Sequence, residues 1–289
     1  NPKTPLLGKL ERALTFQLTE AQARVIREIL SDMTSSKPMN RLVQGDVGSG
    51  KTIVAMQAMV LACGSGYQAA LMAPTEILAE QHYRTMKKLL EPLGLSVVLV
   101  SGGGRAALRK AVCRQVASGA AQVVIGTHAI IQQGVAFSKL GLAVVDEQHR
   151  FGVLQRKTLI EKGYKPDVLV LTATPIPRTL AMTVYGDLDV SVIDQMPPGR
   201  KPVRTFLLND GQRGRAYQIL RDQLRSGRQA YIVYPLVEES EKTDLQAAMQ
   251  GAEQLQADEL AGFRVGLVQG GPEIVGEELA IQAQVLPGE

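Results

Sequence analysis

The chain has 289 residues, of which 45% are hydrophobic and 21% charged, and its formal net charge is +4. This length predicts one large or two ordinary domains with a substantial apolar core. No apolar run approaches the roughly 18 residues of a membrane-spanning helix, and no signal peptide opens the chain, so we expect a cytoplasmic protein without membrane contact. Cys63 and Cys113 form no C-x-x-C pair, which argues against a disulfide or a zinc site.

The charge is distributed unevenly along the chain. Residues 1–228 contain 30 Lys and Arg against 17 Asp and Glu, whereas residues 229–289 contain 2 against 11. The basic part is a candidate surface for a polyanion, although scattered positive charge is as often an ordinary solvated surface.

Two features precede the first predicted strand. Residues 1–18 include Pro2, Pro5 and Gly8 and are predicted to be a tail or the end of a linker. Thr19 and Gln22 have the spacing of a capping box at the start of a helix. A glutamine just upstream of a phosphate-binding loop can instead read the edge of an adenine, so two interpretations of Gln22 remain open.

A glycine-rich segment lies between a strand predicted at residues 41–44 and an apolar helix that begins at Lys51. It matches the phosphate-binding pattern G-x-x-x-x-G-K-[ST]. Its glycines allow backbone N–H groups to point at phosphates, and the helix N-terminus adds positive potential. Lys51 would reach the β- and γ-phosphates, and the Thr52 hydroxyl would bind Mg²⁺. The predicted nucleotide-binding residues of the loop are Gly45, Asp46, Val47, Gly48, Ser49, Gly50, Lys51 and Thr52.

Apolar strands and amphipathic helices alternate after this loop. Strands are predicted at residues 68–73, 95–100, 122–125, 140–145 and 168–171, and helices at 77–90 and 106–117. Strands that are apolar throughout predict a parallel sheet covered on both faces, with ligands bound at the carboxyl ends of the strands.

Polar residues follow these strands. Asp146 and Glu147 end one strand, where a phosphate-loop enzyme places the carboxylate for Mg²⁺ and the one that polarises the attacking water. His149 would then lie near the γ-phosphate, although it can equally be a surface histidine. Residues 172–174 either link the nucleotide to a second site or cap a helix. Residues 73–76 and 126–129 are candidates to hold DNA phosphates, with ordinary helix capping as the alternative.

The alternation breaks at residues 195–202, which are rich in proline and predict an interdomain linker. Residues 203–289 follow, with strands predicted at 203–208, 229–236 and 264–268 and helices at 213–225 and 243–260. About three strands predict only part of a sheet. Residues 273–289 have weak helical periodicity.

Together, the motifs at residues 45–52, 73–82, 126–129, 146–152 and 172–179 resemble those of superfamily 2 helicases. They are most similar to the bacterial RecG family, ATP-dependent helicases of branched DNA. The translocase of the transcription-repair coupling factor shares several motifs, but it usually has Asp-Glu-Glu-His and a Phe at the position of Ser49. Ser49 and Gln148 therefore favour RecG. The resemblance implies an α/β fold with a RecA-like phosphate-loop domain at residues 19–194, and an incomplete second RecA-like domain at 203–289.

The resemblance also implies roles for single residues, with ATP and Mg²⁺ as cofactors and branched or forked DNA as partner of a monomer. Gln22 would contact adenine. Lys51, Asp146 and Glu147 would be catalytic, and Thr52 and Asp146 would hold Mg²⁺. Residues that would couple hydrolysis to movement along DNA are Gln148, His149, Thr172, Ala173 and Thr174. Residues that would line the DNA track are Pro74, Thr75, Glu76, Gly102, Thr127 and His128.

Two parts of the family pattern have no counterpart in the chain: an upstream OB-fold wedge and a downstream segment with transition-state arginines. An arginine finger contributes about 10³–10⁵ in rate. We therefore expect the chain to bind ATP and Mg²⁺, to hydrolyse ATP very slowly and not to unwind DNA. Two alternatives stay open, the coupling-factor translocase and a non-catalytic, nucleotide-dependent DNA-binding module.

Overall fold

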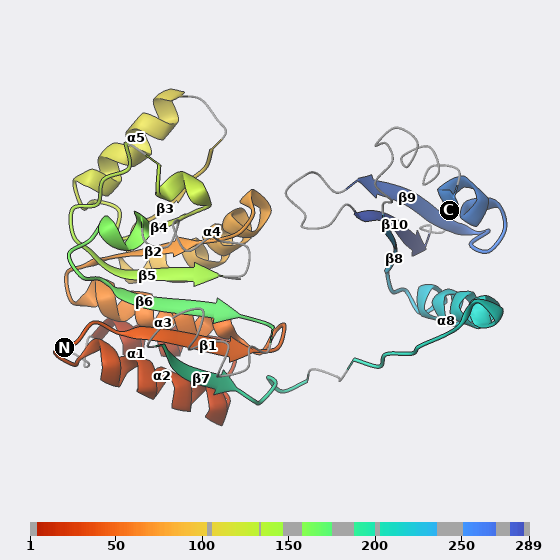
Figure 1. Ribbon diagram of the computed structural model, residues 1–289, viewed down its shortest axis with the longest axis horizontal. Coiled ribbons are helices and arrows are strands. Elements are labelled where there is room, and N and C mark those ends of the chain that lie inside the picture. The colour runs from red at the N-terminus through yellow and green to blue at the C-terminus, as the bar shows by residue number, and fades with distance from the viewer. Residues whose placement is uncertain are drawn as a thin grey trace. The chain divides into compact units, whose positions relative to one another are not determined.

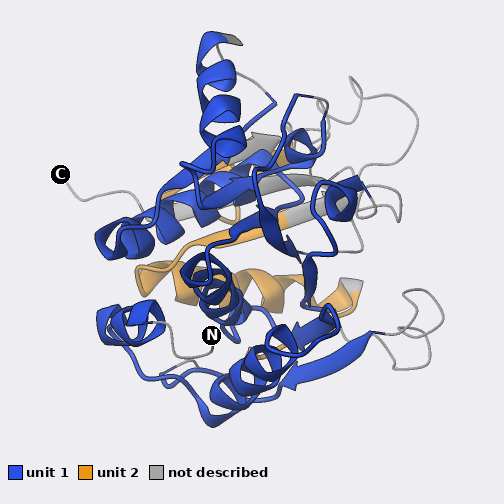
Figure 2. Cartoon of the chain, turned by 90° about the vertical axis from the view of Figure 1, so that its left-hand side faces the viewer, with its two compact units in different colours: residues 1–201 blue, residues 202–289 orange. Residues whose placement is uncertain are grey.

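The computed structural model describes residues 5–102, 106–132, 134–146, 158–174, 188–199, 203–235, 251–269 and 278–285. The chain divides into two compact units, residues 1–201 and 202–289 (Figure 2). This division falls at the end of residues 195–202, the range predicted as the interdomain linker.

The first unit is built on a seven-stranded sheet with the order β3-β4-β2-β5-β6-β1-β7 (Figure 1). Every paired strand in it runs parallel to its neighbour, which confirms the predicted parallel α/β fold. The strands are β1 (Asn40–Gly45), β2 (Gln68–Met72), β3 (Val97–Val100), β4 (Val123–Gly126), β5 (Leu140–Asp146), β6 (Asp167–Thr172) and β7 (Asp189–Ile193). The sequence analysis missed the edge strand β7.

Helices flank this sheet. They are α1 (Pro5–Ala13), α2 (Glu20–Met33), α3 (Lys51–Gly64), α4 (Glu76–Leu90) and α5 (Ala106–Ala117), with short 3₁₀ turns η1 (Glu91–Leu93) and η2 (His128–Ile130). Helix α3 is apolar around its whole circumference, and residues 53–63 are buried, as expected for a helix enclosed by other elements. None of the described helices is long and apolar enough to cross a membrane.

The core lies on both faces of the sheet. Leu71 and Val144 belong to one buried cluster together with α3, whereas their strand neighbours Met72 and Val145 belong to another. Successive side chains of a strand point to opposite faces, so strands that are apolar throughout fill both clusters. This is the physical reason that the predicted parallel sheet forms.

The N-terminal segment differs from the prediction of a tail at residues 1–18. Residues 5–13 form α1, with a proline at its first position, where a missing N–H costs nothing. Leu7 and Leu10 are buried in the same cluster as α3. Helix α1 is therefore part of the packing of the first unit.

The second unit has an α/β composition, as predicted. It contains η4 (Asp210–Gln212), α8 (Arg213–Arg225), β8 (Ala230–Pro235), β9 (Phe263–Gln269) and β10 (Glu278–Val285). Its sheet has the order β8-β10-β9, and β10 runs antiparallel to both neighbours. A small core of Leu224, Leu255, Leu260 and Phe263 supports it.

One prediction for the second unit is wrong. Residues 203–208 form no strand. The side chains of Val203 and Leu207 are 86% and 99% exposed, so this apolar segment is not packed in a sheet. No element was predicted for residues 273–289, where the helical periodicity is weak, and residues 278–285 form β10. Strand pairing depends on a distant partner, which a local pattern does not reveal.

The cysteines are both free thiols. Cys63 is buried in α3, and this burial raises the pKa of its thiol to about 12. A buried thiol with a raised pKa is unreactive. Within the described ranges, no group of three His, Cys, Asp or Glu side chains is placed to hold a metal ion by itself.

Candidate functional site

The predicted site residues that the structure describes lie at one edge of the first sheet, where its parallel strands end. β1 ends at Gly45, β2 at Met72, β4 at Gly126, β5 at Asp146 and β6 at Thr172. These strands are parallel and adjacent in the order β4-β2-β5-β6-β1, so their carboxyl ends lie side by side (Figure 1). Parallel α/β sheets bind ligands at this edge.

The phosphate-binding loop connects β1 to α3. Gly48 and Gly50 have φ values of 78° and 90°, a backbone region that favours glycine. The Lys51 ammonium donates to the carbonyl oxygens of Gly45 at 2.7 Å and Asp46 at 3.1 Å. The side chain thus lies over its own loop. Bonds from a cation to neutral carbonyls are weaker than bonds to an anion, so phosphate oxygens can replace them.

Gln22 joins the start of α2 to this loop. Its side-chain carbonyl accepts from the backbone N–H of Thr19 at 2.9 Å, and its amide donates to the carbonyl of Ser49 at 2.8 Å. The Thr19 hydroxyl in turn accepts from the N–H of Gln22, which confirms the capping box. Both ends of the amide are engaged, and the side chain is 2% exposed. Contact with adenine would require this buried side chain to become more exposed.

Gly50 has a second reason to be glycine. A Cβ at this position would lie 2.2 Å from the amide nitrogen of Gln22. The loop and the start of α2 are therefore packed against one another, and only a residue without a side chain allows this approach.

Asp146 ends β5 and is 9% exposed. Its Oδ2 lies 2.7 Å from Nε2 of His82, which is 8% exposed. An ionised carboxylate only accepts hydrogen bonds, so Nε2 carries the hydrogen and donates it. Sequence reasoning missed this partner. The available signal was a histidine on the buried face of α4, which also contains Ala79, Met86 and Leu90.

The coupling residues are described only in part. Thr172 is 1% exposed, and its hydroxyl lies 2.9 Å from the hydroxyl of Thr174 and accepts from the Thr174 N–H at 3.2 Å. This is a local turn closed by side-chain oxygens. Ala173 lies within it. Glu147, Gln148 and His149 fall outside the described residues.

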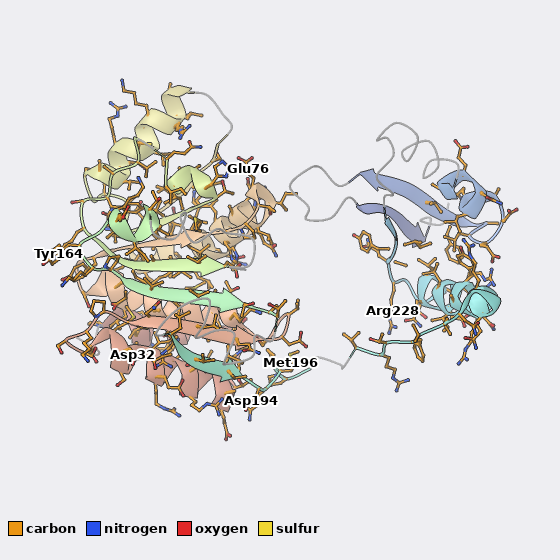
Figure 3. All side chains as sticks on the ribbon, in the orientation of Figure 1. Asp32, Glu76, Tyr164, Asp194, Met196 and Arg228 are labelled. Atoms are coloured by element: carbon orange, nitrogen blue, oxygen red, sulfur yellow. The ribbon has the colours of Figure 1, made fainter. Side chains whose placement is uncertain are left out.

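The predicted DNA-track residues lie at the ends of β2, β3 and β4. Thr75 caps α4 by accepting from the N–H of Leu78 at 3.2 Å. Glu76, at the start of α4 (Figure 3), accepts from the N–H of Gly102 at 3.1 Å, which ties two of the loops together. His128 is exposed on η2. Pro74 directly precedes the cap, and Thr127 is 3% exposed with a hydroxyl that has no hydrogen-bond partner in the described structure.

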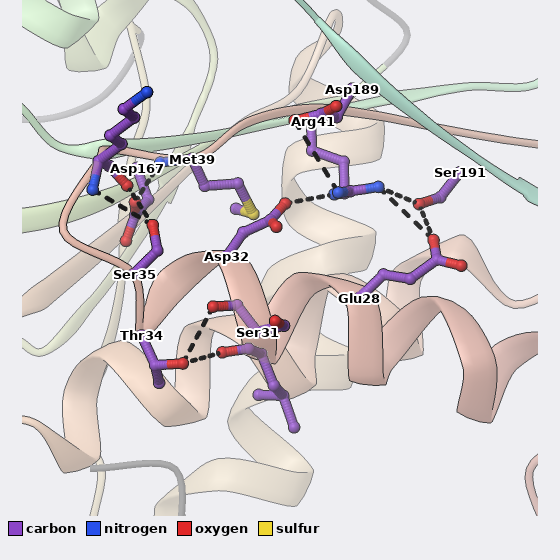
Figure 4. A network of polar contacts seen from close by, with 12 residues as sticks. Glu28, Ser31, Asp32, Thr34, Ser35, Met39, Arg41, Asp167, Asp189 and Ser191 are labelled. Atoms are coloured by element: carbon purple, nitrogen blue, oxygen red, sulfur yellow. Dashed lines mark hydrogen bonds and ion pairs between the residues drawn. The ribbon is translucent and has the colours of Figure 1, made fainter.

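Near the amino-terminal end of β1, a polar network around Arg41 joins β1, α2 and β7 (Figure 4). The Arg41 side chain is 11% exposed and donates to Asp32 at 2.6 Å and to the Ser191 hydroxyl at 2.7 Å. Glu28 lies 3.5 Å from the guanidinium and accepts from Ser191. This network holds the edge strand β7 in place.

The segment that leaves β7 is tied to the start of α2. Arg24 donates to the carbonyl of Val192 at 2.7 Å and pairs with Asp194 at 3.3 Å. The side-chain carbonyl of Gln195 accepts from the N–H of Ala21 at 3.1 Å, beside Gln22. The segment after β7 is thus in contact with α2, the helix whose Gln22 bonds to the phosphate-binding loop. No local sequence pattern indicates this contact.

A cavity of about 200 Å³ lies away from these residues, near the beginnings of β5 and β6. It is lined by Tyr67, Gly141, Tyr164 and Asp167, among others. Asp167 accepts from the N–H of Met39 at 2.7 Å, and burial raises the pKa of its carboxyl. No predicted site residue lines this cavity.

Comparisons with known proteins agree with the motifs. The chain matches the family model of the DEAD/DEAH box helicases over residues 19–183. It is 49% identical over 282 residues to the ATP-dependent DNA helicase RecG of Synechocystis, a match that covers 98% of this chain and 34% of that protein. It is 49% identical over 289 residues to the RecG helicase of Escherichia coli O157:H7, covering 98% and 41%.

A solved structure of RecG bound to a three-way DNA junction is similar to the chain, with a TM-score of 0.74 and 43% identity. That match covers 88% of this chain and 33% of the solved one. The resemblance to RecG helicases is thereby confirmed. The chain spans between about a third and two fifths of the length of the curated relatives it matches.

Proposed function

Because the chain belongs to the DEAD/DEAH box helicase family, we propose that it is the motor part of an ATP-dependent DNA helicase that acts on branched DNA. Replication forks and Holliday junctions, processed in recombination and repair, are the substrates that we assign to it. The main support is the phosphate-binding loop after β1, which shares an edge of the sheet with Asp146 and is separated from it by β6 alone.

ATP fits the loop. Lys51 already lies against the loop carbonyls, where γ- and β-phosphates would become its partners. The Ser49 hydroxyl is buried within the loop with no hydrogen-bond partner in the described residues. A buried polar atom of this kind is satisfied when a ligand binds. Gln22 would contact the adenine with its amide once the side chain becomes more exposed.

Magnesium fits the residues beside the loop. The hydroxyl of Thr52, in the first turn of α3, and the carboxylate of Asp146 are oxygen donors, which is the ligand type that Mg²⁺ prefers. When bound, Mg²⁺ neutralises negative charge that develops on the transferred phosphate. Glu147 is our candidate for the group that orients and deprotonates the attacking water.

DNA would lie across the ends of β2, β3 and β4. Pro74, Thr75 and Glu76 stand at the N-terminus of α4, where backbone N–H groups and the helix dipole favour phosphates. Gly102 is tied to Glu76, so the two loops present one surface. His128 is exposed, whereas the Thr127 hydroxyl is buried and would reach DNA only after a local rearrangement. These contacts address the DNA backbone, so they would position the strand without reading its sequence.

Coupling between ATP hydrolysis and DNA movement is assigned to residues that adjoin the proposed nucleotide site. Thr172 ends β6, the strand between the loop and Asp146, and Ala173 and Thr174 follow it directly. Gln148 and His149 follow Asp146 in the sequence.

We place this motor in the cytoplasm and expect it to act as a monomer.

The Lys51→Ala variant tests the nucleotide site. A bond from a charged donor contributes about 1.5–3 kcal/mol, so loss of the ammonium should weaken nucleotide binding by at least about tenfold. Fluorescence anisotropy of a fluorescent ATP analogue measures the affinity. Lys88→Ala, an exposed lysine on α4, is the matched control and should bind as the unaltered chain does. If Lys51→Ala binds the ATP analogue with the same affinity as the unaltered chain, the loop is not the nucleotide site.

A second measurement concerns the DNA. Affinity for a forked DNA should differ with and without the ATP analogue, and it should fall with rising salt because phosphate contacts release counterions. An affinity for forked DNA that is the same with and without the ATP analogue would indicate an ordinary basic surface.

A further inference from the structure

We propose that His82 is a positioning residue that joins the DNA-facing helix α4 to the carboxylate of Asp146. The proposal rests on the function proposed above, in which α4 begins in the DNA track and Asp146 serves Mg²⁺. The residue that holds this carboxylate is therefore on the element that would contact DNA.

The contact itself is short and buried. Nε2 of His82 donates to Oδ2 of Asp146 over 2.7 Å, and the two residues are 8% and 9% exposed. The bond holds one of the two carboxylate oxygens, and so limits rotation of the group. Carboxylates that bind metals are commonly oriented in this way by a hydrogen-bond donor behind them.

Helix α4 is a stiff connection between this bond and the DNA track. His82 lies about two turns after Glu76, the first residue of the helix. Ala79, Met86 and Leu90 hold the same face of α4 in the core. A packed helix moves as a unit, so a small displacement at its N-terminus is carried to the imidazole ring.

The N-terminal end of α4 is in turn linked to the neighbouring loop. Glu76 accepts from the N–H of Gly102, and Thr75 caps the helix. A DNA strand that engages Gly102 or Thr75 would therefore act on the first turn of α4. The path from DNA to Asp146 consists of one loop contact, one helix and one hydrogen bond.

A structural role alone would have a different signature. A histidine at a core position contributes packing, which a side chain of similar size replaces. A positioning role needs the donor at the place of Nε2, which glutamine supplies with its amide and phenylalanine does not. The pair His82→Gln and His82→Phe separates the two roles.

The experiment measures the magnesium dependence of nucleotide binding to the chain, by anisotropy of a fluorescent ATP analogue across a Mg²⁺ series, with and without forked DNA. In His82→Ala and His82→Phe, the Mg²⁺ midpoint should rise by about 10- to 100-fold. His82→Gln should stay near the unaltered value, as should the control Tyr83→Phe on the same helix. Affinity in EDTA should be the same in all of them.

Forked DNA provides the second readout. It should lower the Mg²⁺ midpoint of the unaltered chain, since coupling between two sites is reciprocal, and this effect should disappear in His82→Ala. An unchanged midpoint in His82→Ala, or a DNA effect that survives the substitution, would overturn the proposal. Thermal unfolding checks that every variant is folded. If His82→Ala does not fold, the proposal is overturned by a folded His82→Phe with the same Mg²⁺ midpoint as His82→Gln.

The two proposals fail separately. If Lys51→Ala binds nucleotide normally, the proposed function is wrong whatever His82 does. If Lys51→Ala loses binding while His82→Ala keeps its Mg²⁺ midpoint, only the positioning role of His82 is wrong.

Discussion

Gly126 offers a sharp test of the sheet that carries the proposed DNA track. It ends β4 directly before Thr127, and a Cβ there would lie 2.2 Å from the backbone carbonyl oxygen of Val100 on β3. Ordinary contact begins at 3.4 Å, so Gly126→Ala would force the paired backbones apart by about 1 Å. Overpacking together with a weakened strand hydrogen bond should lower the free energy of unfolding by about 3 kcal/mol.

Thermal unfolding followed by circular dichroism measures this loss. For a domain of this size, 1 kcal/mol corresponds to a shift of about 2–4 °C, so Gly126→Ala should lower Tm by about 6–12 °C. Gly8→Ala is the matched control, because a Cβ at this exposed position of α1 meets nothing within 4 Å. Alanine there should raise stability by about 0.5–1 kcal/mol. A Gly126→Ala chain that melts with the unaltered one would refute the close approach of β3 and β4.

Two further experiments, with three substitutions, test charged groups at partly buried sites. Arg41→Met should lower the free energy of unfolding by about 2–3 kcal/mol in chemical denaturation, because Asp32 then loses its cation at a mostly buried site. Adding Asp32→Asn should recover part of this loss, and no recovery would contradict the pairing. Burial raises the pKa of Asp167 above its unfolded value of 3.8, so the folded state binds more protons and stability falls as pH rises through the folded-state pKa. Asp167→Asn keeps an acceptor for the Met39 N–H, and its Tm should be higher than that of the unaltered chain at pH 7. This difference in Tm should vanish below pH 3.8. A difference in Tm that is independent of pH would exclude the carboxyl as its source.

Elements with a strong local pattern were predictable. The phosphate-binding loop is recognised from contiguous residues, and β2, β5 and β6 contain apolar runs long enough to indicate buried strands. β7 escaped prediction because its burial alternates, as expected for an edge strand. Helix α1 was missed because Pro5 and Gly8 suggested a linker, whereas Leu7 and Leu10 pack on α3.

The sequence by itself determined the class of chemistry, because a phosphate loop, an acidic strand end and helix starts are each encoded by a few neighbouring residues. The tertiary structure alone decided which side chains share a bond. His82 and Asp146 are 64 residues apart, and Gln22 and Ser49 are 27 apart. Such pairs depend on the order of the strands in the sheet, since that order brings His82 of α4 to the end of β5 and Gln22 of α2 to the loop. Local patterns carry no information on that order, so the histidine behind the carboxylate became visible only in the folded chain.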